Sequence, residues 1–344
     1  MNKRKLVKPI VAAVILLLII ILPLIVTNVY WIHVFILIAL MILLTASMRA
    51  INRTGEVSLG TAGFMLLGGY SAALLSIKLG LSPWLTLLLG GLFTAAVAAA
   101  LAYSFFRIKG VYFVITTLLT GFIFLYIAGY LNNLTGGWQG LHFFDVSLNP
   151  ITIGSITIEF TTKTNVAYYY LTIIVVGLCL FVLYRMENSR IGLVWKSIRE
   201  SDNLAKSLGV NIMAQKIFIF IVACFFTGLA GALYAFHSHN LSPTTTPANI
   251  FHFQNSVYCL LYMVVGGIDS FYGPLIGTTL FMLVTELTRG MDEYRPLLYG
   301  GILILIIFFM PKGLMGLRDY IPEWSKKLSE RYRKKTREKS APLQ

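Results

Sequence analysis

Charged residues are scarce in this chain of 344 residues, and acidic residues are the scarcest of them. Charged side chains make up 12% of the sequence, and 14 Asp and Glu stand against 28 Lys and Arg. Soluble domains carry about 25% charged residues, so the composition excludes an ordinary soluble domain. Because 57% of the residues are hydrophobic, the class that fits is an all-α integral membrane protein. The net charge of +14 is then explained by basic residues in the loops on one side of the membrane. It does not require a nucleic acid as a partner.

The chain also lacks the usual residues of a disulfide, metal or nucleotide site. Its three cysteines lie in apolar stretches without metal-ligand spacing, which is typical of small core residues: Cys179, Cys224 and Cys259. A zinc site at His237, His239 and His252 is disfavoured, because no HExxH motif or nearby carboxylate accompanies them. No GxxxxGK[ST] loop is present, so any ATP must be bound by a partner. We expect no metal, no cofactor and no enzymatic activity.

Acidic residues are nearly absent from the predicted spans. Asp269 and Glu286 are the only acids that we place near spans, and both map to span ends. Ion-coupled transporters normally need an ionisable group within the membrane. The sequence therefore disfavours proton coupling, so that energy enters from outside the chain or transport is passive. An autonomous secondary carrier or channel stays as the alternative to an energised transporter.

Apolar runs predict a helical bundle of about ten transmembrane helices within a single domain, residues 1–317. One crossing of a membrane core of roughly 30 Å takes about 20 apolar residues. The basic start at residues 3–5 and the apolar run that follows lack a cleavage site, so we expect a retained first span. The predicted spans are 10–27, 29–47, 57–77, 84–106, 111–131, 167–184, 216–237, 253–266, 273–288 and 296–311. The eighth and ninth are short, and half-helices of a broken segment are an alternative for 253–288.

The basic residues predict the orientation of these spans. In the ten-span arrangement, 24 of the 28 Lys and Arg fall on the side of both termini, and such an excess marks the cytoplasmic side. We expect a multi-pass protein of the cell membrane of a prokaryote, with both termini cytoplasmic. A basic tail over 318–344 is expected to meet anionic lipid. The outer loop, 132–166, contains alternating segments 151–153 and 156–158 around Gly154-Ser155, which predict a β-hairpin.

The longest cytoplasmic loop, 185–216, has helical periodicity from Gly192 to Leu208. Leu193, Ile198, Ala205 and Leu208 recur on one partly apolar face. Ser201 and its neighbours predict the N-cap of a second short helix, and Gly209 its C-terminal glycine. Two short amphipathic helices are therefore expected at the membrane surface. Periodicity alone leaves two roles open, an interfacial connector or a docking site.

The loop sequence SRIGLVWKSIRESDNLAKSLGV (residues 189–210) resembles the coupling segment of the branched-chain amino acid permease family of ABC importers. Further strings resemble family signatures in their expected order: GEVSLGTAGFMLLGGYSAALL, RIKGVYFVITTLL, LTGGWQGL, FTGLAGALYA, VVGGIDSFYGPLIGTTL and PKGLMGL. The resemblance extends from residue 55 to 316. The resemblance implies that a set of loop residues contacts the ATPase: Arg190, Gly192, Ile198, Arg199, Glu200, Ala205 and Gly209. Ser189 also matches the family pattern. Ala205 and Gly209, four apart, are expected to present a small face to a partner.

What the resemblance implies is a permease subunit that translocates branched-chain amino acids without covalent chemistry. The implied partners are a second homologous permease in a heterodimer, two ABC ATPase subunits and an extracytoplasmic solute-binding protein. Phe122 stands where many relatives carry a glutamate, which puts leucine, isoleucine and valine in doubt as substrates. Urea, short amides or another small polar solute are the alternatives within the same class.

Hydroxyl and glycine positions are the candidates for a translocation path, because hydroxyls can solvate a zwitterion. The expected path residues are Ser58, Gly60, Thr116, Thr117 and Ser270. Hydrogen bonds between helices are the alternative role of these hydroxyls. The remaining glycines are expected to let helix backbones approach closely, as in the GxxxG pair of Gly273 and Gly277 and in the glycines of one early helix, Gly60, Gly63, Gly68 and Gly69.

Overall fold

The computed structural model describes residues 21–23, 28–143, 148, 150–153, 156–158, 160, 165–244, 249–288, 290, 294–310 and 313–316. The chain divides into two compact units, Met1–Cys259 and Leu260–Gln344. Helices dominate both units, as the composition predicts.

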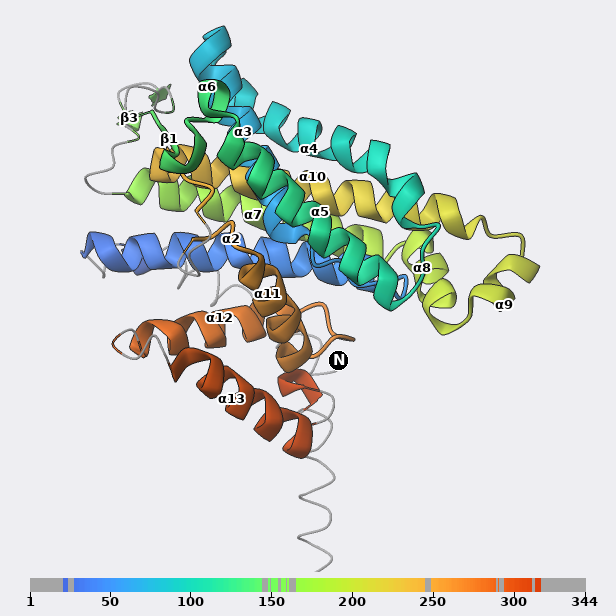
Figure 1. The fold of residues 1–344 in the computed structure, drawn as a ribbon. Coiled ribbons are helices and arrows are strands. Elements are labelled where there is room, and N and C mark those ends of the chain that lie inside the picture. The colour runs from blue at the N-terminus through green and yellow to red at the C-terminus, as the bar shows by residue number, and fades with distance from the viewer. Residues whose placement is uncertain are drawn as a thin grey trace, which may run out of the picture. The chain divides into compact units, whose positions relative to one another are not determined.

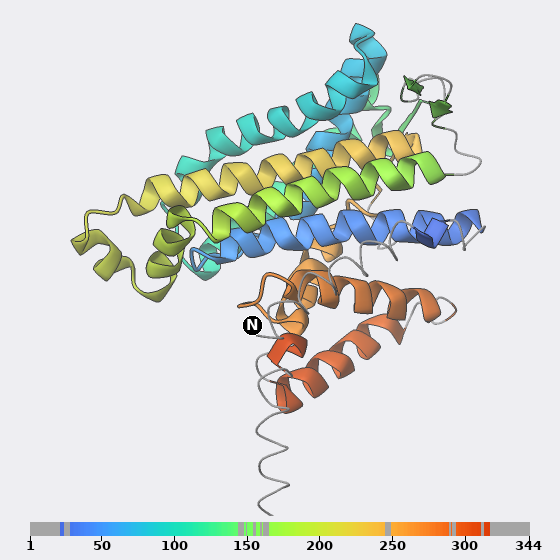
Figure 2. The same cartoon turned by 180° about the vertical axis from the view of Figure 1, so that it is seen from behind.

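The first unit contains six helices that are long and apolar enough to cross a membrane. They are α2 (Val29–Asn52), α3 (Thr61–Leu79), α4 (Pro83–Phe105), α5 (Val111–Tyr130), α7 (Val166–Glu187) and α10 (Ile212–Ser238). They match six of the predicted spans, from 29–47 to 216–237. In Figure 1 and, from behind, Figure 2, α2, α7 and α10 run side by side, and α10 also contacts α3 and α4. The predicted first span, 10–27, falls almost entirely outside the described residues.

Three further helices are shorter than a full crossing. They are α11 (Phe253–Gly266), which begins in the first unit, and α12 (Gly273–Leu287) and α13 (Arg295–Phe309) in the second. With 14, 15 and 15 residues they extend only about 21–23 Å at 1.5 Å per residue. Six full-length helices are thus confirmed among the described residues, and the count of ten crossings stays a prediction. The short lengths suit the half-helix alternative for 253–288.

The predicted turn between α11 and α12 depends on glycine. Gly267 has φ +110°, a backbone conformation that side-chain-bearing residues rarely adopt. A Cβ at Gly273 would overlap the carbonyl oxygen of Gly267, and one at Gly277 would overlap that of Tyr262. The predicted packing role of Gly273 and Gly277 is therefore confirmed. A 3-10 turn, η3 (Leu314–Gly316), also lies in this unit.

Close backbone contacts join α3, α4 and α10. A Cβ at Gly68 on α3 would overlap the backbone of Gly228 on α10, and one at Gly231 would overlap the Met65 carbonyl. On α4, a Cβ at Gly90 would lie 2.7 Å from the Gly68 oxygen. Lipid tails are as apolar as the surfaces of these helices, so burying one helix against another gives no hydrophobic gain. Helices in lipid therefore associate through close packing of this kind. The three helices therefore form the central contact of the first unit.

An aromatic cluster closes the end of this contact nearest the cytoplasmic loop. The Phe220 ring on α10 meets Phe64, Phe105 and Phe106 edge to face, with ring centroids 5.6–5.8 Å apart. Such geometry is preferred over flat stacking. The cysteines are free and buried, which confirms their interpretation as small core residues.

The outer segment contains short elements: α6 (Asn132–Thr135), η1 (Gly137–Gln139), β1 (Leu141–His142), β2 (Ile151–Ile153) and β3 (Ile156–Ile158). The predicted hairpin is confirmed, because β2 and β3 pair antiparallel with Thr152 opposite Thr157. Strand β1 pairs with β4 (Asn240–Leu241), which directly follows α10. This pairing ties the outer segment to the end of α10.

We predict that Gly68→Val destabilises the chain, because the side chain must separate α3 from α10. Overpacking of this kind costs about 1–3 kcal/mol. The measurement is thermal unfolding in detergent, followed by a thiol-reactive dye that reports exposure of the three buried cysteines. Gly177→Ala is the matched control, since a Cβ at Gly177 has open space. Equal unfolding temperatures for the two variants would contradict the close-packing assignment.

Candidate functional site

The loop at 185–216, predicted to be cytoplasmic, forms two short capped helices, α8 (Arg190–Glu200) and α9 (Asp202–Ser207). Ser201 is the N-cap of α9, and its Oγ accepts a hydrogen bond from the Leu204 amide at 3.4 Å. Gly209 has φ +79°. The amide of Gly209 donates to the Lys206 carbonyl and that of Val210 to the Ala205 carbonyl, which is a Schellman ending. Both predicted caps are confirmed.

The loop has a small core of its own. Ile198, Ala205 and Ile212 are buried together, and Val194 and Val210 pack against them. Ala205 and Ile198 therefore face the core of the loop, whereas Gly209 is exposed. Ala205 brings α9 close to its own chain, and contact of Ala205 and Gly209 with a partner stays a prediction.

Trp195 attaches α8 to α10. Its side chain is 1% exposed, and its Nε1 donates a hydrogen bond of 3.2 Å to Oε1 of Gln215. The helical periodicity of the sequence missed this residue. The only signal was a tryptophan in a loop otherwise rich in charge.

Three leucines of the loop are exposed and take no part in its core. Leu193 is 69% exposed, Leu204 68% and Leu208 78%. The periodicity placed Leu193 and Leu208 on one face with Ile198 and Ala205. The structure separates them, because the break at Ser201 rotates α9 relative to a continued α8. Exposed leucines at 204 and 208 are one helical turn apart.

The polar candidates of α8 lie mostly in solvent. Arg190 and Glu200 are exposed and Arg199 is half-buried. A Cβ at Gly55, in the connection between α2 and α3, would lie 3.8 Å from the Arg199 Cα, so this connection runs beside α8. A Cβ at Gly192 would overlap the Glu187 carbonyl. Gly192 therefore lets α8 turn back closely on the end of α7.

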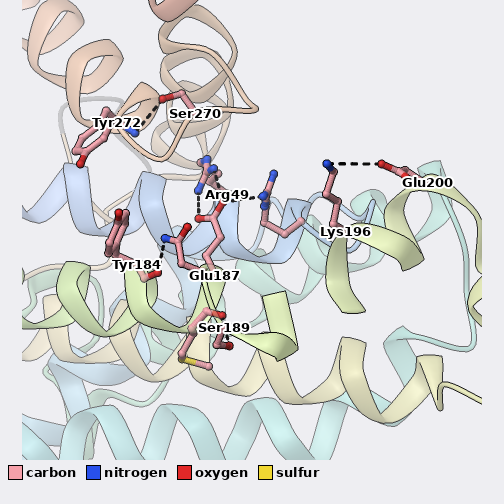
Figure 3. Close-up of polar contacts among 11 residues, drawn as sticks. Arg49, Tyr184, Glu187, Ser189, Lys196, Glu200, Ser270 and Tyr272 are labelled. Atoms are coloured by element: carbon pink, nitrogen blue, oxygen red, sulfur yellow. Dashed lines mark hydrogen bonds and ion pairs between the residues drawn. The ribbon is translucent and has the colours of Figure 1, made fainter. Parts of the chain in front are cut away.

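Glu187 joins the end of α7 to the end of α2 (Figure 3). Arg49 contacts it with both terminal nitrogens, Nη1 to Oε2 at 2.6 Å and Nη2 to Oε1 at 2.8 Å. Arg53 adds a contact of 2.9 Å from Nη2 to Oε1. The Arg49 and Glu187 side chains are only 3% and 13% exposed. A bidentate pair of this burial is strong and geometrically specific.

A second ion-pair cluster joins α9 and α10 to the connection before α3. Lys216 Nζ lies 3.0 Å from Oε1 of Glu56 and 3.6 Å from Oδ1 of Asp202, and the Lys216 and Glu56 side chains are each 9% exposed. Lys109 Nζ, on the connection between α4 and α5, lies 3.6 Å from Oδ2 of Asp202. Four segments therefore meet at this cluster.

The prediction that only Asp269 and Glu286 lie near spans is wrong for Glu56 and Glu187. Both are largely buried, Glu187 at the end of α7 and Glu56 in the connection before α3, beside basic residues of the same predicted side. The signal was present in the sequence, since Glu56 directly precedes the predicted span at 57–77 and Lys216 begins the one at 216–237. Opposite charges at span ends of one side are natural partners.

Three of the expected path residues lie together at the start of α3. Ser58 and Thr117 are buried. The Leu59 amide donates to Thr117 Oγ1 at 3.1 Å and the Gly60 amide to Ser58 Oγ at 3.4 Å. These hydroxyls therefore accept from backbone amides at the start of α3, and their place on a translocation path stays a prediction.

Ser256, at the beginning of α11, completes this arrangement and was missed. Its Oγ accepts from the Ala62 amide at 2.9 Å and from Thr61 Oγ1 at 3.0 Å. Thr116 is half-buried on α5, where its hydroxyl donates to the Tyr112 carbonyl at 2.7 Å. Ser270 lies in the other unit, in the turn before α12, and its Oγ accepts from the Tyr272 amide at 3.3 Å (Figure 3).

An open apolar hollow of about 600 Å³ lies along one face of α5. Its lining includes Phe122, whose ring packs 4.9 Å from that of Phe253. The full lining is Leu119, Phe122, Ile123, Tyr126, Ile127, Tyr130 and Leu131. Phe122, the position singled out by the resemblance, thus belongs to an apolar surface.

The histidines of the disfavoured zinc site have other partners in the structure. Nδ1 of His33 lies 2.7 Å from Nε2 of His237, and Nε2 of His239 lies 3.4 Å from the Tyr168 hydroxyl. Burial lowers the pKa of His252 from its usual value. Within the described part of the chain, no three side chains of His, Cys, Asp or Glu are placed to hold a metal ion.

Comparison with known proteins gives the family. The model of the "Branched-chain amino acid transport system / permease component" family matches residues 24–309. The branched-chain amino acid permease protein LivM of Salmonella typhimurium is 30% identical over 284 residues, which cover 78% of this chain. The chain spans 65% of the length of that relative, somewhat under two thirds. No solved structure matches the chain.

Two more distant relatives carry other names. The nucleoside ABC transporter permease protein NupC of Lactococcus lactis is 27% identical over 249 residues, 69% of this chain and 74% of the relative. LivH of Escherichia coli, also named a branched-chain amino acid permease protein, is 24% identical over 158 residues, 45% of this chain and 48% of the relative. Since the family model covers far more than half of it, the chain belongs to the family of membrane permease components of branched-chain amino acid transport systems.

Proposed function

We propose that this chain is a permease subunit of an ATP-driven importer for branched-chain amino acids. It spans the cell membrane of a prokaryote in about ten passes with both termini in the cytoplasm. An extracytoplasmic binding protein delivers the solute, a second homologous permease completes the pore, and two ABC ATPase subunits supply the energy. The names of LivM and LivH support the solute and the permease pair.

The α8–α9 loop is the observation that carries this proposal. It is a folded unit with a core, two caps and ion pairs to the spanning helices. A simple connector needs none of these. A folded loop that presents leucines outward is suited to receive a partner and to pass its movement to the bundle. We therefore assign ATPase docking to the surface formed by Leu193, Leu204 and Leu208.

The expected coupling residues divide by position under this proposal. Arg190, Arg199 and Glu200 lie toward solvent on α8, where an ATPase can contact them. Gly192, Ile198, Ala205 and Gly209 act by shaping the loop, because they permit its close turns and fill its core. The path for the solute runs along α5, past Thr116 and the apolar hollow. An apolar lining is compatible with aliphatic side chains.

A nucleoside is the second candidate solute, supported by the name of NupC. The loss of an acid at Phe122 is consistent with a solute that carries no amino cation. Uptake assays with the assembled importer decide between the two solutes.

We predict that reconstituted transport requires the whole assembly. Liposomes with both permeases, the ATPase pair and the binding protein are expected to take up leucine only when ATP is present on the side of the membrane that carries the ATPases. The control replaces the phosphate-binding lysine of the ATPases, which stops hydrolysis. Rapid leucine flux through the purified chain alone would instead identify a carrier or channel.

We predict that Leu208→Gln weakens ATPase binding. A leucine side chain buried on docking contributes about 1.5–3 kcal/mol, so affinity is expected to fall by about ten- to hundredfold. The measurement is binding of labelled ATPase to the permease in nanodiscs. Leu79→Gln, at an exposed leucine that ends α3 and lies outside the loop, is the control. Unchanged affinity for Leu208→Gln removes the docking assignment.

We predict that Gly209 tolerates Asn and rejects Val. Its φ of +79° suits glycine and, to a lesser extent, asparagine, whereas a branched side chain is strained there. Gly209→Val should therefore loosen α9, which tryptic cleavage after Lys206 reports, and reduce transport. Gly209→Asn should retain both. If both variants lose ATPase binding with the loop intact, Gly209 acts by direct contact instead.

A further inference from the structure

We propose that the α8–α9 loop is joined to the spanning helices by two ion-pair clusters of unequal strength, and that the weaker one opens and closes as the loop moves. The closed cluster is Arg49, Arg53 and Glu187. The other cluster, called the exposed cluster after Lys109 and Asp202, is Asp202 with Lys109 and the nearly buried Lys216, which also holds Glu56. This inference rests on the proposed function, because it assigns how the loop transmits movement. The residues are positioning residues and touch no solute.

The closed cluster fixes the beginning of α8. Glu187 is the last residue of α7, and both of its carboxylate oxygens accept from arginines on the last turn of α2 (Figure 3). Gly192 packs against the backbone of the same residue. Because the pair is bidentate and nearly buried, removing one partner leaves an uncompensated buried charge. The start of α8 therefore moves only together with the ends of α2 and α7.

The exposed cluster holds α9 more weakly. Asp202 is the first residue of α9, its side chain is 32% exposed, and that of Lys109 is 75% exposed. Both lysine nitrogens lie 3.6 Å from a carboxylate oxygen, beyond ordinary hydrogen-bond length. The Asp202–Lys109 pair is exposed, so it is weak and is screened by salt. Lys216 is nearly buried but keeps Glu56 at 3.0 Å, so Asp202 can part from it without leaving the lysine unpaired.

The partners of Asp202 lie on elements that are far apart in the sequence. Lys109 belongs to the connection between α4 and α5, next to the helix that carries Thr116 and the apolar hollow. Lys216 lies in the second turn of α10 and remains paired with Glu56 when Asp202 leaves. A movement of α9 therefore first changes the contact of Asp202 with Lys109, next to the start of α5, while Lys216 on α10 stays paired with Glu56. Because of this difference the cluster passes movement of α9 to α5 and does not simply hold α9 in place.

The test compares Asp202→Asn, Lys109→Gln and the double variant in the fully assembled importer in liposomes. The readout is the amount of leucine transported per ATP hydrolysed. Each single variant is expected to lower this ratio by up to about fivefold, the most that a surface ion pair supplies. ATP hydrolysis and the unfolding temperature should stay near wild type, and the double variant should be no worse than either single one.

Lys78→Gln serves as the control, because it removes an exposed lysine at the opposite end of the bundle, outside both clusters. A transport ratio equal to that of wild type in Asp202→Asn overturns the inference. So does a fall in the ratio that is matched by an equal loss of folded protein, since a purely structural role would give that result.

A measurement on the purified chain separates this inference from the proposed function. Hydrogen exchange of backbone amides should quicken in α9 alone for Asp202→Asn, and in both α8 and α9 for Glu187→Gln. The double variant Arg49→Gln/Glu187→Gln should slow the exchange part of the way back, because the most buried arginine charge is removed together with its carboxylate, while Arg53 still loses its Glu187 contact. If the wild-type assembly transports nothing, the proposed function fails, and the exchange pattern alone supports or overturns the two-cluster attachment.

Discussion

The contact among α3, α4 and α10 is the constraint on which the rest of the first unit depends. Gly68, Gly228 and Gly90 bring three backbones together where any side chain would intrude. With α10 held in this way, its first turns place Lys216 beside Glu56 and Gln215 beside Trp195. The geometry of the cytoplasmic loop is thus set by a contact deep among the helices.

The sequence predicted the class of fold and most elements of the first unit. Apolar runs mark α2 to α5, α7 and α10 because a helix surrounded by lipid and protein is apolar on all sides. The hairpin at 151–158 and the two caps at Ser201 and Gly209 followed from local turn chemistry, which acts over a few residues. Glycine packing was equally readable, since close approach is the main reason for such residues in apolar helices.

The sequence failed where the outcome depends on partners distant in the chain. Ala205 looks like a small contact for another protein, but Ile198 and Ile212 cover it. Glu187 looks like a loop acid until α2 brings two arginines to it. The hydroxyls of Ser58 and Thr117 accept from amides of the α3 start, contacts that the sequence did not indicate. Periodicity reports which face is apolar but not what covers it.

Helix α10 is held differently along its length, and this limits how it can move. Its outer end continues into β4, which pairs with β1, and its middle is locked by glycine contacts to two helices. Among the described residues, its first turns are held by side chains, at Ile212, Gln215, Lys216 and the Phe220 ring. A rod fixed at one end and at its middle can neither slide along its axis nor tilt as a whole. Any displacement of the α8–α9 loop that carries these first turns with it therefore requires α10 to bend.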